Sequence, residues 1–209
     1  MRKNFIIALF ATLFLVSCGG SGSDSGSGPD GKRLLPEKTD YKMFTDEAEV
    51  KRVMDGVIAK AGDNMSKIDE IDISISRPSK IGSVRFDRPD NASIRLIHLN
   101  PDDPKTLREN RYWSGDGKWD GETKTVQLLV GDAENFVLAD EMYDASALTS
   151  DMVAKTVMEA WNKYKDDTKY SEQWVEDIKI KEGKITVLVR GILASNGIDK
   201  YETYEKKLK

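Results

Sequence analysis

Two groups of acidic residues are the parts of this chain whose types and spacing could do acid–base chemistry. Asp116, Asp120 and Glu122 lie in one short stretch, and Asp140 and Glu141 lie in another. Glycoside hydrolysis requires two carboxyl groups about 5 to 9.5 Å apart across the scissile bond. A carboxylate-dependent enzyme that acts on glycan is therefore one hypothesis, and it requires that folding bring two of these acids together.

Other catalytic and metal chemistries have little support in this sequence. His98 is the only histidine, and it shares a strand side with Ile94 and Leu96, so we expect a hydrogen-bonded structural residue. No Gly-x-Ser-x-Gly run is present to expose a nucleophile, and the acids of 116–122 do not have calcium-loop spacing. We therefore expect no enzyme activity, no metal, and no nucleotide or redox cofactor.

Tyr112, Trp113 and Trp119 form the best candidate interaction surface. Strand alternation puts Tyr112 and Trp113 on opposite faces, so one of them packs in the core. The other, together with Trp119, could stack on a sugar ring or anchor a protein partner. The alternative is that all three are core residues, because large aromatic side chains are mostly buried in domains of this size.

Cys18 closes the run Leu15-Val16-Ser17-Cys18, after an apolar stretch over 5–16 that follows Arg2 and Lys3. A basic start, a short apolar run and small residues at the cut site are the parts of an export signal. Residues 1–18 resemble the signal of a bacterial lipoprotein. The resemblance implies cleavage before Cys18, a diacylglycerol on its thiol and acylation of the new amine. An ordinary cleaved signal with a chance cysteine, or a free thiol, are the alternatives.

The chain after the signal predicts a tether and then a folded domain. Residues 19–31 are mostly Gly and Ser, a composition that forms a flexible coil, so we expect a lipidated tether over 18–40 with a mean reach of about 20 Å. We expect the globular domain over 41–209, as one core or as halves 41–146 and 147–209. Bacterial lipoproteins without Asp after the cysteine, where Gly19 stands here, usually go to the outer membrane.

Charge argues against a nucleic-acid partner. The formal net charge is -4, and loss of Arg2 and Lys3 with the signal makes the mature chain more negative. Nucleic-acid binding normally requires a basic face, whereas acids and bases are interspersed here.

Periodicity predicts two helices, each followed by strands, and hence an α+β fold. The first helix spans 46–61, with Thr45 as cap, and the second begins at Thr149 or Ser150. Period-two apolar residues predict strands after the first helix at Ile71, Ile73, Ile75, Val84, Phe86, Ile94, Leu96, Val126, Leu128 and Val130. A hairpin turns at Asp116-Gly117. Strands after the second helix contain Ile178, Ile180, Ile185, Val187, Val189, Ile198, Tyr201 and Tyr204.

The recurrence of a helix and then strands has two explanations. It indicates either a duplicated α-β-β-β unit or ordinary α+β architecture with helices packed on an antiparallel sheet. We expect a membrane-anchored envelope lipoprotein that acts as a non-catalytic binding module for an envelope protein, a peptide or a glycan. The glycan-acting enzyme and a structural envelope component remain the alternatives.

Overall fold

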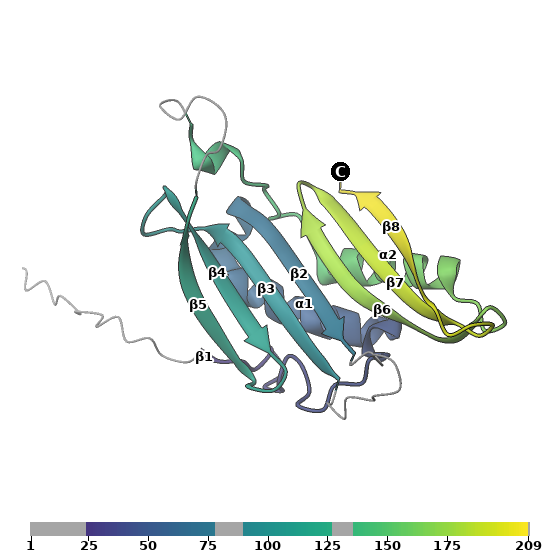
Figure 1. Cartoon of the computed structure of the whole chain (residues 1–209). Helices are drawn as coiled ribbons and strands as arrows, with labels where there is room; N and C mark the ends of the chain where they lie inside the picture. Colours follow the sequence, from purple (N-terminus) through teal and green to yellow (C-terminus); the bar gives the residue numbers. More distant parts are fainter. Residues whose placement is uncertain (1–23, 78–89, 127–135, 209) are drawn as a thin grey trace, which may run out of the picture.

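The computed structural model describes residues 24–77, 90–126 and 136–208. They form an α+β fold in which two helices cover one face of an antiparallel sheet (Figure 1). The strand order is β1-β5-β4-β3-β2-β6-β7-β8. The predicted strand residues Val84, Phe86, Leu128 and Val130 lie outside the described residues.

The sheet consists of two groups of strands, which meet at the central β2–β6 pair. The first group consists of β2 (Ile68–Ser76), β3 (Asn91–Leu99), β4 (Thr106–Trp113) and β5 (Lys118–Thr125). The second consists of β6 (Tyr170–Lys181), β7 (Lys184–Leu193) and β8 (Asp199–Lys207). Because β2 pairs with β6, the two groups form one continuous sheet.

Both helices have 15 residues and begin at side-chain caps. In α1 (Glu47–Ala61) the cap is Asp46, one residue after the predicted Thr45, and its carboxylate accepts from the Ala48 amide. In α2 (Ser150–Tyr164) the hydroxyl of Thr149 accepts from the Met152 amide. Short 3-10 turns lie at η1 (Met43–Thr45), η2 (Gly62–Lys67) and η3 (Leu138–Asp140).

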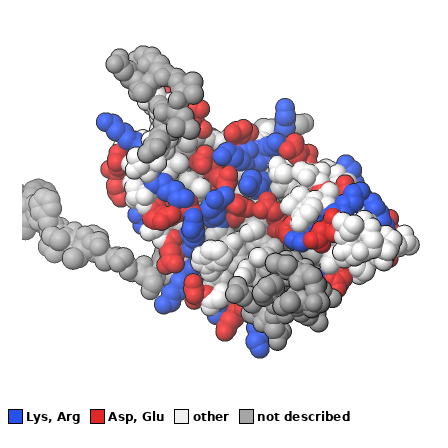
Figure 2. All heavy atoms as spheres, viewed as in Figure 1, with Lys and Arg blue, Asp and Glu red and all other residues white. Residues whose placement is uncertain are grey.

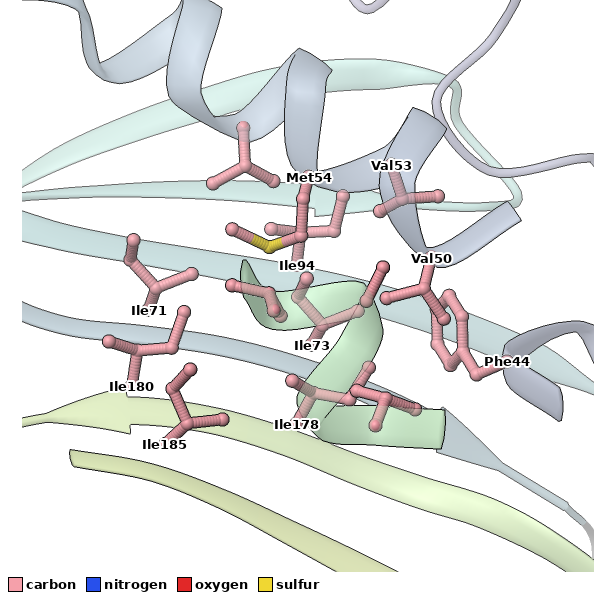
Figure 3. Close-up of a cluster of buried hydrophobic side chains, with 14 of the residues drawn as sticks. Phe44, Val50, Val53, Met54, Ile71, Ile73, Ile94, Ile178, Ile180 and Ile185 are labelled. Carbon is pink, nitrogen blue, oxygen red and sulfur yellow. The ribbon is translucent and has the colours of Figure 1, made fainter. Parts of the chain in front are cut away.

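The core lies between the helices and the sheet. Isoleucines from both strand groups point toward the helix layer, including Ile73 of β2 and Ile178 of β6 (Figure 3). Ile73 and Ile178 are direct cross-strand partners and are both fully buried. Residues from 41–146 and 147–209 therefore share one hydrophobic core, and the two predicted halves are not separate.

The folded part begins before residue 41. Strand β1 (Asp24–Ser25) pairs with β5, and Leu34 and Leu35 are 1% and 0% exposed. The predicted tether over 18–40 thus overlaps the folded domain from Asp24 onward. We call residues 24–35 the N-terminal strap. The Gly- and Ser-rich composition of this region favoured the prediction of a tether, although its two leucines are buried against the folded domain.

Candidate binding face

The sheet face away from the helices, here called the open face, has no second layer within the part of the chain that the structure describes (Figure 1). It carries polar side chains in rows that cross several strands. One row runs from Arg111 through Arg95 and Asp72 to Lys179 on neighbouring strands. Figure 2 views this face and shows bases and acids interspersed over β2 to β5.

Ion pairs connect the charged side chains of these rows into a network over β2 to β5. The Arg95 guanidinium contacts Asp72 at 3.0 Å and also pairs with Glu70. Glu109 is fully buried between Arg111 and Lys124. Burial alone would raise the pKa of Glu109, but hydrogen bonds from Lys124 and Arg111 lower it below its usual value. This half of the open face satisfies its own charges and has little need of a partner.

A pair of carboxyl groups lies at the β2–β6 junction. Asp177 of β6 is the cross-strand partner of Ser74, and Asp72 lies two residues along β2 on the same face. Burial, then the neighbouring Asp72 carboxyl, raises the pKa of Asp177 to about 8. Asp72 is already paired with Arg95. We interpret Asp177 as a buried carboxyl that keeps its proton at neutral pH.

The other half of the open face carries apolar and aromatic side chains. We call Leu188 and Ile192 of β7 with Tyr201 and Thr203 of β8 the β7–β8 patch. Tyr201 is 48% exposed, and Leu188 and Ile192 are half-buried. Ile198, in the adjoining turn, is 59% exposed. In Figure 2 the uncharged surface gathers over this side of the sheet.

Arg190 supports the β7–β8 patch from within. Its guanidinium lies 5.3 Å from the centre of the buried Trp174 ring and 5.1 Å from that of Tyr201. Two ion pairs of 2.5 Å, to Glu176 and Asp199, neutralise it. The arginine therefore holds Tyr201 in place without presenting a free charge.

The structure separates the three predicted surface aromatics. Tyr112 and Trp119 are cross-strand partners on the helix side, 0% and 6% exposed, with ring centres 5.5 Å apart. Trp113 lies on the open face and is 43% exposed. The expectation that Trp119 would join an exposed surface is corrected, because the hairpin register places it opposite Tyr112 in the core.

The five predicted carboxylates lie at two places in the structure, the β4–β5 hairpin and η3. All five are exposed: Asp120 and Glu122 on β5, Asp116 in the hairpin turn, and Asp140 and Glu141 at η3. Glu122 lies near Arg111 and Lys124, at 3.9 and 3.7 Å. In the described ranges no three Asp, Glu, His or Cys residues are grouped as a metal site would require.

His98 is a structural residue, as its position beside Ile94 and Leu96 indicates. It is 5% exposed, its Nδ1 lies 2.7 Å from the Leu99 carbonyl and its Nε2 lies 3.1 Å from the Asn110 amide nitrogen. A neutral ring with the proton on Nδ1 satisfies both contacts. Burial lowers the pKa of His98 and favours this neutral form.

One serine arrangement escaped the sequence analysis because its members come from different helices. The Ser150 hydroxyl donates to Asp55 at 2.5 Å, and Lys51 Nζ lies 3.4 Å from the hydroxyl oxygen of Ser150. A hydrogen bond from Lys51 to Asp151 raises the pKa of that lysine, so its amine stays protonated and cannot act as a base. Ser150 is 5% exposed and ties α1 to α2.

Comparison of this chain with family models, with curated proteins and with solved structures found no match. Among the described residues, the helices are all too short or too polar to cross a membrane. Function must therefore be inferred from the residues and the geometry above.

Proposed function

We propose that this protein is an exported lipoprotein of the bacterial cell envelope, cleaved before Cys18 and held to the outer membrane by lipid on that cysteine. The support is the run Leu15-Val16-Ser17-Cys18 after a short apolar stretch. Two or three acyl chains would make the attachment stable, since each buried methylene contributes about 0.8 kcal/mol.

The mature domain is a binding module, and the β7–β8 patch is its contact surface for a protein partner. The observation that carries this proposal is an exposed aromatic side chain that its neighbours hold in place. Tyr201 is exposed at 48%, is backed by Arg190 and Trp174, and lies beside Leu188 and Ile192. Aromatic and arginine side chains dominate the binding energy of protein interfaces, and a ring held by its neighbours loses little entropy on binding.

The two helix-and-strand groups are products of a duplication. Buried residues lie at the same distances from each helix cap: Val50, Val53, Met54 and Val57 after Asp46, and Val153, Thr156, Val157 and Ala160 after Thr149. The first strand of each group meets its counterpart at the β2–β6 pair, and the later strands extend outward on opposite sides. Equal helix lengths, equal cap positions and this arrangement support the proposal.

A photoreactive phenylalanine analogue in place of Tyr201 tests the binding proposal in cells that make the full-length protein. We expect a defined protein adduct on irradiation, and loss of that adduct when Leu188→Lys is added. The same analogue at Glu122, exposed on β5 at the far edge of the open face, is the matched control and should give no such adduct. Equal adducts from both positions, or an adduct from neither, would contradict the assignment of the patch. If irradiation links position 201 to glycan and gives no protein adduct, the partner is a glycan and not a protein.

A further inference from the structure

The N-terminal strap is fastened to the β4–β5 end of the sheet. Arg33 donates from Nη2 to the carbonyl oxygens of Ser114 and Gly115 in the hairpin turn, at 2.7 and 3.2 Å. Arg52 of α1 donates to the carbonyl oxygens of Arg33 and Leu34, at 3.0 and 3.1 Å. These contacts hold the strap against both the hairpin and the first helix.

Small residues allow the strap to lie this close. A side chain at Gly26 would collide with the ring of Tyr112, and one at Gly56 would collide with Leu34. Leu34 is 1% exposed in the resulting pocket. The chain therefore joins the folded body at Asp24, opposite Trp119 on β5, and the strap adds nothing to the length of the tether.

The length of chain before Asp24 limits how far the body can stand from a lipid at Cys18. Asp24 lies six positions after Cys18, and fully extended chain spans at most about 3.6 Å per position, or roughly 22 Å in all. A flexible chain of that length has a mean reach of about 13 Å. The bilayer surface is thus close to the edge of β5 where Asp24 is held.

Within the residues that the structure describes, Trp113 is the large aromatic side chain that is exposed on the β4–β5 side of the sheet. It closes the β4–β5 hairpin, and the Gly117 amide donates to its carbonyl oxygen at 2.9 Å. Strand β4 is two strands from β1, about 10 Å at ordinary strand spacing. The Trp113 side chain is 43% exposed, whereas its neighbours Tyr112 and Trp119 are buried.

The charges around this end do not favour an ionic contact. Lys32 and Lys118 are exposed there, but Asp30 and Asp116 are exposed beside them. A polybasic surface would be drawn to anionic lipid, whereas the two lysines and two aspartates named here, among the residues that the structure describes, balance one another. An amphipathic indole ring prefers the headgroup level of a bilayer whatever the lipid charge.

We propose that the β4–β5 hairpin faces the bilayer and that Trp113 rests among the lipid headgroups. The β7–β8 patch lies on the same face of the sheet, with β3, β2 and β6 between it and β4. This inference rests on the proposed lipidation of Cys18. It deepens the proposed function, because it assigns the β4–β5 side of the sheet to lipid and leaves the β7–β8 side for a protein partner.

Quenching of tryptophan fluorescence by brominated phospholipids tests the inference with full-length, acylated protein in phosphatidylethanolamine and phosphatidylglycerol vesicles. Intact mass first establishes that the sample is acylated. We expect quenching of the wild type and loss of most of it in Trp113→Phe. Adding Tyr201→Trp to that variant places a new ring at the patch and should not restore quenching.

The outcomes separate the two proposals. Acylated protein whose quenching is equal in the wild type and in Trp113→Phe would overturn the orientation and leave the lipoprotein intact. Quenching restored by a tryptophan at residue 201 would overturn it as well, since the patch would then face lipid. Protein without acyl mass would contradict the proposed anchor itself and remove the basis for the orientation. Near-ultraviolet circular dichroism of each variant checks that its fold is retained.

Discussion

Asp72 of β2 and Asp177 of β6 lie on the open face of the sheet at the junction of the two strand groups, where Asp177 pairs with Ser74, two residues along β2 from Asp72. Burial and the neighbouring Asp72 carboxyl favour a proton on Asp177, and raise its pKa to about 8. At neutral pH the folded protein therefore holds a proton that the unfolded chain releases. Stability should consequently fall as pH rises from about 4, the ordinary pKa of aspartate, through 8.

Asp177→Asn should remove this pH dependence, because the amide has no proton to lose. Urea unfolding should show little difference from the wild type at pH 4. By pH 9 the variant should be more stable by roughly 2 kcal/mol or more, since each unit of pKa shift corresponds to about 1.4 kcal/mol. Asp120→Asn, an exposed acid on β5, is the control. A variant that loses stability at every pH would contradict the retained proton on Asp177.

Leu34→Ala should destabilise the whole domain, because Leu34 packs in the core against Gly56 of α1. Truncating a buried leucine costs about 2–4 kcal/mol, and thermal unfolding will measure the loss. Lys38→Ala, exposed just beyond the strap, should have no comparable effect. Equal melting temperatures for the two variants would mean that the strap is a free tether.

His98 should titrate below its ordinary pKa of about 6.5, because burial disfavours the charged ring. As pH falls below 6.5 the unfolded chain takes up a proton that the native ring resists, so stability declines by up to about 1.4 kcal/mol per pH unit. The single imidazole gives one set of proton NMR signals, which makes the midpoint directly measurable. A midpoint above 6.5 would conflict with the buried, neutral ring.

Ser150→Ala should lower the stability by about 1 kcal/mol, since it removes the hydroxyl that links Asp55 of α1 to α2. A fluorophosphonate probe should leave the wild-type serine unlabelled, because Lys51 remains protonated. Asp151→Asn, which removes the partner of Lys51 at the same helix start, separates the two contacts. Covalent labelling of Ser150 would instead indicate a nucleophile.

Local pattern was sufficient for the helices and much of the sheet. Apolar spacing located the first helix and the start of the second to within a residue, and the period-two isoleucines Ile71, Ile73 and Ile75 all lie in β2 on the helix side. Alternation also separated Tyr112 from Trp113. These features depend on neighbours a few residues apart, which is the range over which side-chain periodicity operates.

Long-range pairing was not available from the sequence. Asp72 and Asp177 meet only because β2 and β6 are adjacent, and Ser150 meets Asp55 only because the helices pack together. The burial of Trp119 follows from the hairpin register, which a single residue of slippage would reverse. The strap was predicted as part of a flexible tether because its Gly and Ser content favours a coil. The residues that bury Leu34 and Leu35 lie on elements distant in the sequence.

Intact mass and membrane fractionation of the native protein beside Cys18→Ala test the central claim most directly. The account predicts that native protein lacks residues 1–17, carries lipid-sized additional mass and sediments with outer membranes, and that the variant loses both the mass and the sedimentation. Native protein that is soluble, unmodified at Cys18 and indistinguishable from the variant would contradict the lipoprotein and its orientation together.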